Sequence, residues 1–146
     1  MRATGARIKF ISDGDVAGAI MAARPNIGVD MMMGVGGTPE GVVTACAMRA
    51  IGGAIQAKLW FKDDEQKQRA IDAGHDLDRV LNTNDLVTTD NVYMVATGIT
   101  DGELLQGVQY TAWGATTESL VMRGRSGTVR SIHTEHALRK LAKTAL

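Results

Sequence analysis

The sequence predicts a layered α/β fold with a mainly parallel sheet, in which βα units are followed by a β-meander and a C-terminal helix. Short apolar runs alternate with helical segments up to about residue 99. Helical spacing then largely disappears, and short apolar runs separated by glycines follow. The chain has 146 residues, of which 45% are hydrophobic, and this is enough for one core. We therefore expect residues 1–146 to form a single domain.

The first βα unit begins near the start of the chain. Residues 2–7 resemble the last turn of a helix that ends at Gly5, although the earlier turns of such a helix do not precede it. A short apolar strand at residues 8–11, a turn at 12–15 and a helix of small residues at 16–23 follow.

The second βα unit has clear helix boundaries. Residues 29–35, which include Met31, Met32 and Met33, form an apolar run typical of a strand that is buried on both faces. A helix at residues 39–51 follows. Thr38 can cap this helix, Pro39 suits its first position, and Gly52 and Gly53 end it.

The rest of the chain continues the α/β pattern and then changes to short strands. Residues 54–61 predict a third strand, and residues 63–73 predict a charged, exposed helix that stops at Gly74. The final elements are a strand at residues 92–99, meander strands at 108–113, 116–122 and 128–133, and a basic helix at 135–146.

Charge and composition exclude several function classes. The 16 Lys and Arg residues balance the 16 Asp and Glu residues, so no overall field favours nucleic acid or an anionic membrane. The single cysteine, Cys46, excludes an internal disulfide framework, and no leader or long apolar span opens the chain. An aromatic content of 4% does not suit the stacking of bases. We therefore expect a cytoplasmic protein that binds neither nucleic acid nor a membrane.

The loop Asp13-Gly14-Asp15 places two carboxylates directly after the first predicted strand. Open α/β sheets bind ligands at this end of their strands, so the loop predicts binding of a polyol or a metal. A structural explanation stays open, in which Asp15 caps the following helix and Asp13 solvates the turn.

The second loop, residues 34–41, is rich in glycine and opens a helix. Glycine lets backbone amides approach a ligand closely, and a helix N-terminus favours anions such as phosphate. A dinucleotide fingerprint would need glycine in place of Pro39, and a P-loop would need lysine in place of Val42, which argues against nucleotide binding. Taken alone, Glu40 is better explained as a partner of the helix dipole than as a metal ligand.

Together the two loops predict one site. Consecutive parallel strands would place both loops at the same end of the sheet, so Asp13, Asp15, Gly37 and Glu40 are expected to converge on one cleft. The segment DGDV, followed about twenty residues later by GGTPEG, resembles the class II fructose-1,6-bisphosphatases. The later segments ATGITDGELLQGV and ATTESLVMRGRSGTVR resemble the C-terminal sequence of the same family, so the resemblance covers essentially the whole chain.

The resemblance implies a metal-dependent phosphatase of the lithium-sensitive phosphatase superfamily. Such enzymes use Mn²⁺ or Mg²⁺ to hydrolyse the 1-phosphate of fructose 1,6-bisphosphate to fructose 6-phosphate, in gluconeogenesis and glycerol metabolism. Some relatives also accept sedoheptulose 1,7-bisphosphate, and the full-length form is expected to be a homo-oligomer. On this resemblance Asp13, Gly14 and Asp15 contact the substrate, Gly37 contacts it through its backbone, and Glu40 is a metal ligand.

The resemblance also implies that this chain is the C-terminal portion of such an enzyme, with the N-terminal metal-binding half absent. That half supplies the other metal-binding carboxylates and much of the phosphate site. A lone Glu40 is too little to hold a catalytic metal, so we expect the chain to contribute part of the site and to be inactive without the N-terminal half. Two alternatives stay open: a non-catalytic module that binds sugar phosphates, and an oligomerisation domain.

Overall fold

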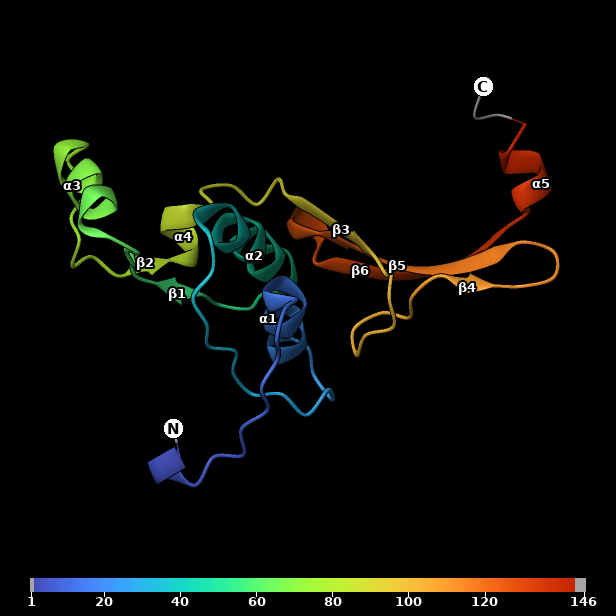
Figure 1. Cartoon of the computed structure of the whole chain (residues 1–146), viewed down its shortest axis with the longest axis horizontal. Coiled ribbons are helices and arrows are strands. Elements are labelled where there is room, and N and C mark those ends of the chain that lie inside the picture. The colour runs from blue at the N-terminus through green and yellow to red at the C-terminus, as the bar shows by residue number, and fades with distance from the viewer. Residues whose placement is uncertain (1, 144–146) are drawn as a thin grey trace.

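The computed structural model describes residues 2–143 of the chain as an elongated α/β molecule (Figure 1). Helix α1 (Asp15–Ala23) packs against α2 (Thr38–Ile51), and α2 in turn packs against the strands β3 (Tyr93–Thr97) and β5 (Ala115–Arg123). The other elements are η1 (Arg2–Thr4), β1 (Gln56–Ala57), α3 (Asp64–Asp72), β2 (Leu81–Asn82), α4 (Thr83–Leu86), β4 (Gln109–Tyr110), η2 (Gly124–Ser126), β6 (Thr128–His136) and α5 (Leu138–Leu141).

The main sheet is built around β5. Strand β6 pairs with β5 along its full length, and β3 and β4 pair with different parts of its other edge. The register places Val95 opposite Val121 and Ser119 opposite Ile132. The predicted meander is therefore confirmed, although β4 is shorter than expected and β6 is longer.

The structure corrects the expectation of a mainly parallel sheet. Every strand pair in residues 2–143 is antiparallel, including the small pair of β1 and β2. Residues 8–11 and 29–35 do not form strands, because no neighbouring segment of the described chain bonds to their backbone. Of the third predicted strand, only Gln56 and Ala57 are paired. A run of apolar residues favours extended backbone but does not supply the neighbour that a strand needs.

The predicted helices agree with the structure better than the predicted strands do, because residues close in sequence determine where a helix begins and ends. Helices α1, α2 and α3 begin and end within one residue of the predicted positions, and Gly52 ends α2 in the left-handed conformation (φ 76°). The predicted helix at 135–146 is only partly seen. Strand β6 continues to His136, and α5 spans only Leu138–Leu141. Residues 144–146 of that prediction lie outside the described residues.

The core lies between α1, α2 and the inner face of the sheet. Small side chains on α2 let the helix lie close to both neighbours, and Leu120 and Met122 of β5 are fully buried beneath it. The buried cluster consists of Ile20, Ala45, Ala47, Met48, Ala50, Val87, Val92, Leu120 and Met122.

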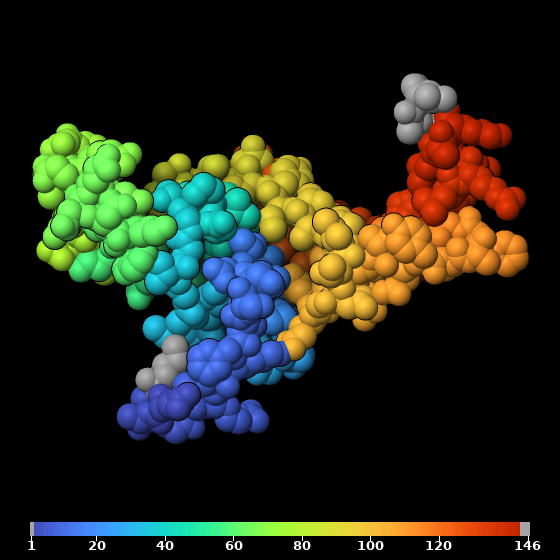
Figure 2. Space-filling view, viewed as in Figure 1, coloured from blue at the N-terminus to red at the C-terminus, as the bar shows by residue number. Residues whose placement is uncertain are grey.

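Side chains at the ends of the molecule are more exposed to solvent than those of the core. Figure 2 shows the N-terminal segment, the connection between β4 and β5, and helix α5 projecting from the central body. The expectation that the three methionines fill a core is wrong for Met31 and Met33, which are 70% and 64% exposed. Among the described residues, no helix has the length and apolar content that a membrane crossing requires.

Candidate functional site

The first predicted loop leads directly into α1. Gly14 adopts the left-handed conformation (φ 77°, ψ 35°) that an L-residue rarely tolerates, and Asp15 is the first residue of the helix. The N-cap position is Gly14, and no side chain caps the helix. The explanation of Asp15 as an N-cap is therefore wrong, and its half-buried carboxylate lies in the first helical turn.

Asp13 lies just outside this turn. Its side chain is exposed, and the Ser12 hydroxyl lies 3.4 Å from its Oδ2 atom, within reach of a weak hydrogen bond. Within residues 2–143 Asp13 makes no hydrogen bond or ion pair with the second loop. The structure therefore keeps Asp13 next to the site but does not bring it into the group described below.

The second predicted loop leads into α2. Helix α2 begins at Thr38, one residue earlier than predicted, and Gly37 is its extended N-cap residue (φ −70°, ψ 158°). Thr38 consequently does not cap the helix. Glu40 lies in the first turn and is exposed, so its carboxylate is accessible at the N-terminal end of the helix.

The two loops meet at Gly36. A methyl group built on Gly36 would lie 3.4 Å from Oδ2 of Asp15 and 3.9 Å from Oε2 of Glu40. A methyl group on Gly37 would overlap Oε2 of Glu40. The structure thus brings Asp15, Gly37 and Glu40 together, and it adds Gly36, which the sequence reasoning missed although it lies within the glycine-rich loop.

This arrangement differs from the one predicted. The side chains meet at the N-termini of α1 and α2, and the strands that should have led into these helices are absent from the described chain. Backbone N–H groups at helix N-termini favour anions, whereas the two carboxylates attract cations. The site therefore offers groups for both a phosphate and a metal ion.

The residues fit a divalent metal only in part. Hard cations such as Mg²⁺ take oxygen ligands, commonly one or two carboxylates together with water and substrate phosphate. Asp15 and Glu40 are two carboxylates near Gly36, but no group of three His, Cys, Asp or Glu side chains in residues 2–143 is arranged to hold a metal. A site with two metal ions would need ligands from outside this part of the chain.

A separate cavity lies at the other end of α2. It has a volume of about 470 Å³ and does not include the predicted site residues. Arg49 crosses it, donating to Oδ1 of Asn84 and pairing with Asp90 at 2.8 Å. No sequence signal identified this cavity. Its lining residues are Met48, Arg49, Gly52, Gly53, Thr83, Asn84 and Asp90.

Comparison with known proteins identifies the family. The family model described as bacterial fructose-1,6-bisphosphatase, glpX-encoded, matches residues 1–136. The chain is 41% identical to the class 2 fructose-1,6-bisphosphatase of Haemophilus influenzae, over 95% of this chain and 46% of the relative. It is 39% identical to fructose-1,6-bisphosphatase 1 class 2 of Escherichia coli strain K12, over 94% of this chain and 45% of the relative.

These matches confirm the resemblance found in the sequence motifs. The chain spans about half the length of the curated relatives that it matches. The family model covers both loops of the site and the whole of the main sheet. On this evidence the chain belongs to the bacterial, glpX-encoded family of class II fructose-1,6-bisphosphatases.

Proposed function

We propose that this chain forms one side of the active site of a metal-dependent fructose-1,6-bisphosphatase. The reaction is hydrolysis of the 1-phosphate of fructose 1,6-bisphosphate to give fructose 6-phosphate, a step of gluconeogenesis in the cytoplasm. The observation that carries the proposal is the meeting of Asp15 and Glu40 at Gly36, in a chain of this family. Acceptance of sedoheptulose 1,7-bisphosphate and assembly into a homo-oligomer belong to the same proposal.

The proposed roles follow the chemistry of each group. Glu40 provides an oxygen ligand for Mn²⁺ or Mg²⁺. Asp13 and Asp15 accept hydrogen bonds from sugar hydroxyls, and Gly14 and Gly37 let the backbone approach the substrate closely. When bound, the metal polarises the phosphoryl group and lowers the pKa of the attacking water.

The chain by itself is expected to be inactive. Its described residues offer two carboxylates at the site, and phosphoryl transfer assisted by two metal ions needs more. The remaining ligands would come from the part of the family sequence that this chain does not span. Sustained Mn²⁺-dependent turnover by the pure 146-residue chain would show that the site is already complete and would refute this partial role.

The test is a chimera in which this chain replaces the matching part of the Haemophilus influenzae relative, so that the protein has full length. We expect Mn²⁺-dependent release of phosphate from fructose 1,6-bisphosphate, and loss of at least about 100-fold in kcat for Glu40→Gln, because an amide binds a hard cation poorly. Glu65→Gln is the matched control, since Glu65 is also an exposed glutamate in the first turn of a helix.

The outcomes separate the candidate functions. Equal activity of Glu40→Gln and Glu65→Gln would refute the metal role of Glu40. A folded chimera that binds fructose 1,6-bisphosphate without hydrolysing it would favour the non-catalytic sugar-phosphate module instead.

A further inference from the structure

Two segments that belong to no helix or strand expose apolar side chains. We call residues 7–11 and 29–35 the open segments. Phe10 is 80% exposed, Met31 is 70% exposed, and Met33 and Val35 are each 64% exposed. Single exposed apolar residues are ordinary, but a group of this size marks a surface that another molecule covers.

The backbone of the open segments is also unpaired. Within residues 2–143 none of their N–H or C=O groups makes a hydrogen bond to the rest of the chain. Lys9 does contact Glu103, but only through its side chain. Backbone with free donors and acceptors can pair with another strand to form a β-sheet.

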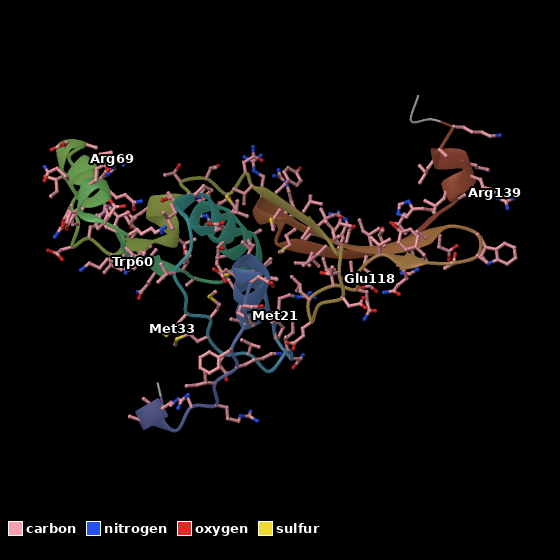
Figure 3. All side chains as sticks on the ribbon, viewed as in Figure 1. Met21, Met33, Trp60, Arg69, Glu118 and Arg139 are labelled. Atoms are coloured by element: carbon pink, nitrogen blue, oxygen red, sulfur yellow. The ribbon has the colours of Figure 1, made fainter. Side chains whose placement is uncertain are left out.

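Both open segments lie against α1. A methyl group built on Gly18 of α1 would lie 3.2 Å from Cδ1 of Ile11 and 3.4 Å from Cγ of Met32. These two side chains therefore face the helix, and neighbouring apolar side chains remain exposed. Figure 3 shows Met33 on the connection between α1 and α2, while Met21 projects from α1 itself.

Each open segment continues directly into one of the site loops. Residues 7–11 lead to Asp13 and Asp15, and residues 29–35 lead to Gly36 and Glu40. Polypeptide that pairs with the open segments would consequently run close to the two carboxylates. This is the place where the proposed function needs further ligands.

We propose that the open segments become β-strands by pairing with the polypeptide that corresponds to the part of the curated relatives not spanned by this chain. The inference deepens the proposed function and rests on it for the identity of the occupant. The relatives are long enough to provide that occupant, since this chain covers only 45–46% of their length. A second copy of this chain is less suitable, because it would bring the same carboxylates and no new kind of ligand.

Amide hydrogen exchange tests the pairing. It is measured on the pure chain and on the full-length chimera with the Haemophilus influenzae relative. We expect amides in the open segments to exchange at least about 100-fold more slowly in the chimera, because strand pairing protects N–H groups. Equal exchange rates in both proteins would overturn the inference. Protection that appears in the pure chain as its concentration rises would make a second copy the occupant, and would also overturn it.

Two substitutions give a second test of the proposed strand pairing. Phe10→Asp leaves the unfolding midpoint of the pure chain unchanged, because Phe10 is 80% exposed there, but it lowers the midpoint of the chimera by several degrees. Trp113→Asp is matched in kind and exposure (86%) and lies outside the open segments, so it should change neither midpoint. An unchanged chimera midpoint with Phe10→Asp would contradict the inference.

A chimera that does not fold still leaves a decisive measurement. The chain is then co-expressed with the remaining part of the relative as a separate polypeptide. Copurification that Phe10→Asp abolishes supports the surface, and the absence of copurification overturns it. If the amides of the open segments are protected but no phosphate is released, the strand pairing is supported and the proposed function is rejected. If phosphate is released but the amides are not protected, the proposed function is supported and the strand pairing is rejected.

Discussion

Shortening Leu120 to alanine should remove a large part of the stability of this chain. Leu120 lies in the middle of β5, is 0% exposed, and is paired with Ala96 of β3 and Ser131 of β6. It belongs to the same buried cluster as Ile20 of α1 and the apolar face of α2. The substitution removes buried apolar atoms at the point where both helices meet the sheet.

The expected loss for Leu120→Ala is about 3 kcal/mol. Buried Leu→Ala changes cost about 2–5 kcal/mol, which includes the cavity that remains. We choose the lower half of this range because Met48 and Met122 in the same cluster are flexible and can fill part of the cavity. Domains have about 5–15 kcal/mol of stability in total, so the variant should still fold.

The assay is urea unfolding of the pure chain followed by circular dichroism. With a slope of about 1.5 kcal/mol per molar urea, the midpoint should fall by about 2 M without a change of slope. Val95→Ala is the control, because Val95 lies on the adjacent strand β3 but is 60% exposed. A loss below about 1 kcal/mol for Leu120→Ala, or a loss equal to that of Val95→Ala, would refute the described core.

Three further predictions concern single positions. Gly41→Ala should raise the free energy of unfolding by about 0.5–1 kcal/mol in the same urea assay, because alanine favours the helix and no atom lies within 4 Å of the added methyl group; a decrease would contradict the packing described for α2. Gly114→Ala should lower it by about 1–3 kcal/mol, because the methyl group would overlap the backbone carbonyl of His136; an unchanged midpoint would show that this close approach is absent. The backbone N–H of Asn82, together with a smaller contribution from a nearby arginine, lowers the pKa of Asp85 from its ordinary value of 3.8. Since the folded pKa is the lower one, the stabilisation is complete above about pH 4 and is lost as the pH falls through the folded pKa. The stability difference between the unmodified chain and Asp85→Asn should therefore shrink as the pH falls below 3.8, and a difference that does not change with pH would argue against this cause.

The helices were predictable because their boundaries depend on nearby residues. Gly52 ends α2 and the charged helix α3 begins at Asp64 with Asp63 as its cap, whose side chain accepts from the backbone N–H of Gln66. Each of these contacts spans only a few positions, so the sequence shows both partners side by side. Whether strands pair in a parallel or an antiparallel way cannot be predicted from nearby residues, because the paired strands are distant in sequence.

The apolar run at residues 29–35 shows where this limit lies. Composition predicted a strand that is covered on both faces, and the described chain leaves most of the run exposed. An apolar pattern states that a segment favours burial, but it does not identify the molecule that buries it. The apolar pattern therefore wrongly predicted a parallel sheet. The exposure of the same residues is the basis for proposing that another polypeptide covers the open segments.

The convergence of Asp15, Gly37 and Glu40 was predicted, although the sheet that was expected to cause it is absent from the described chain. Asp15, Gly37 and Glu40 do meet, although they meet through the N-termini of two helices. Their convergence was predictable because each residue lies within two positions of a helix start that glycine or proline marks. Gly36 was missed because nothing in the sequence distinguishes it from its glycine neighbours before the position of Asp15 is known.

The arrangement around Gly36 also tests whether helix dipoles alone explain the positions of the Asp15 and Glu40 carboxylates. A carboxylate in the first turn of a helix complements the dipole of that helix, and this accounts for Asp15 or Glu40 taken singly. It treats each helix separately and does not address why both carboxylates lie near the same glycine. Two helices could satisfy their dipoles equally well with carboxylates that point away from each other. A metal ion at Glu40 and a sugar hydroxyl at Asp15, as proposed, would give both carboxylates a reason to lie near Gly36, which the explanation by helix dipoles alone does not.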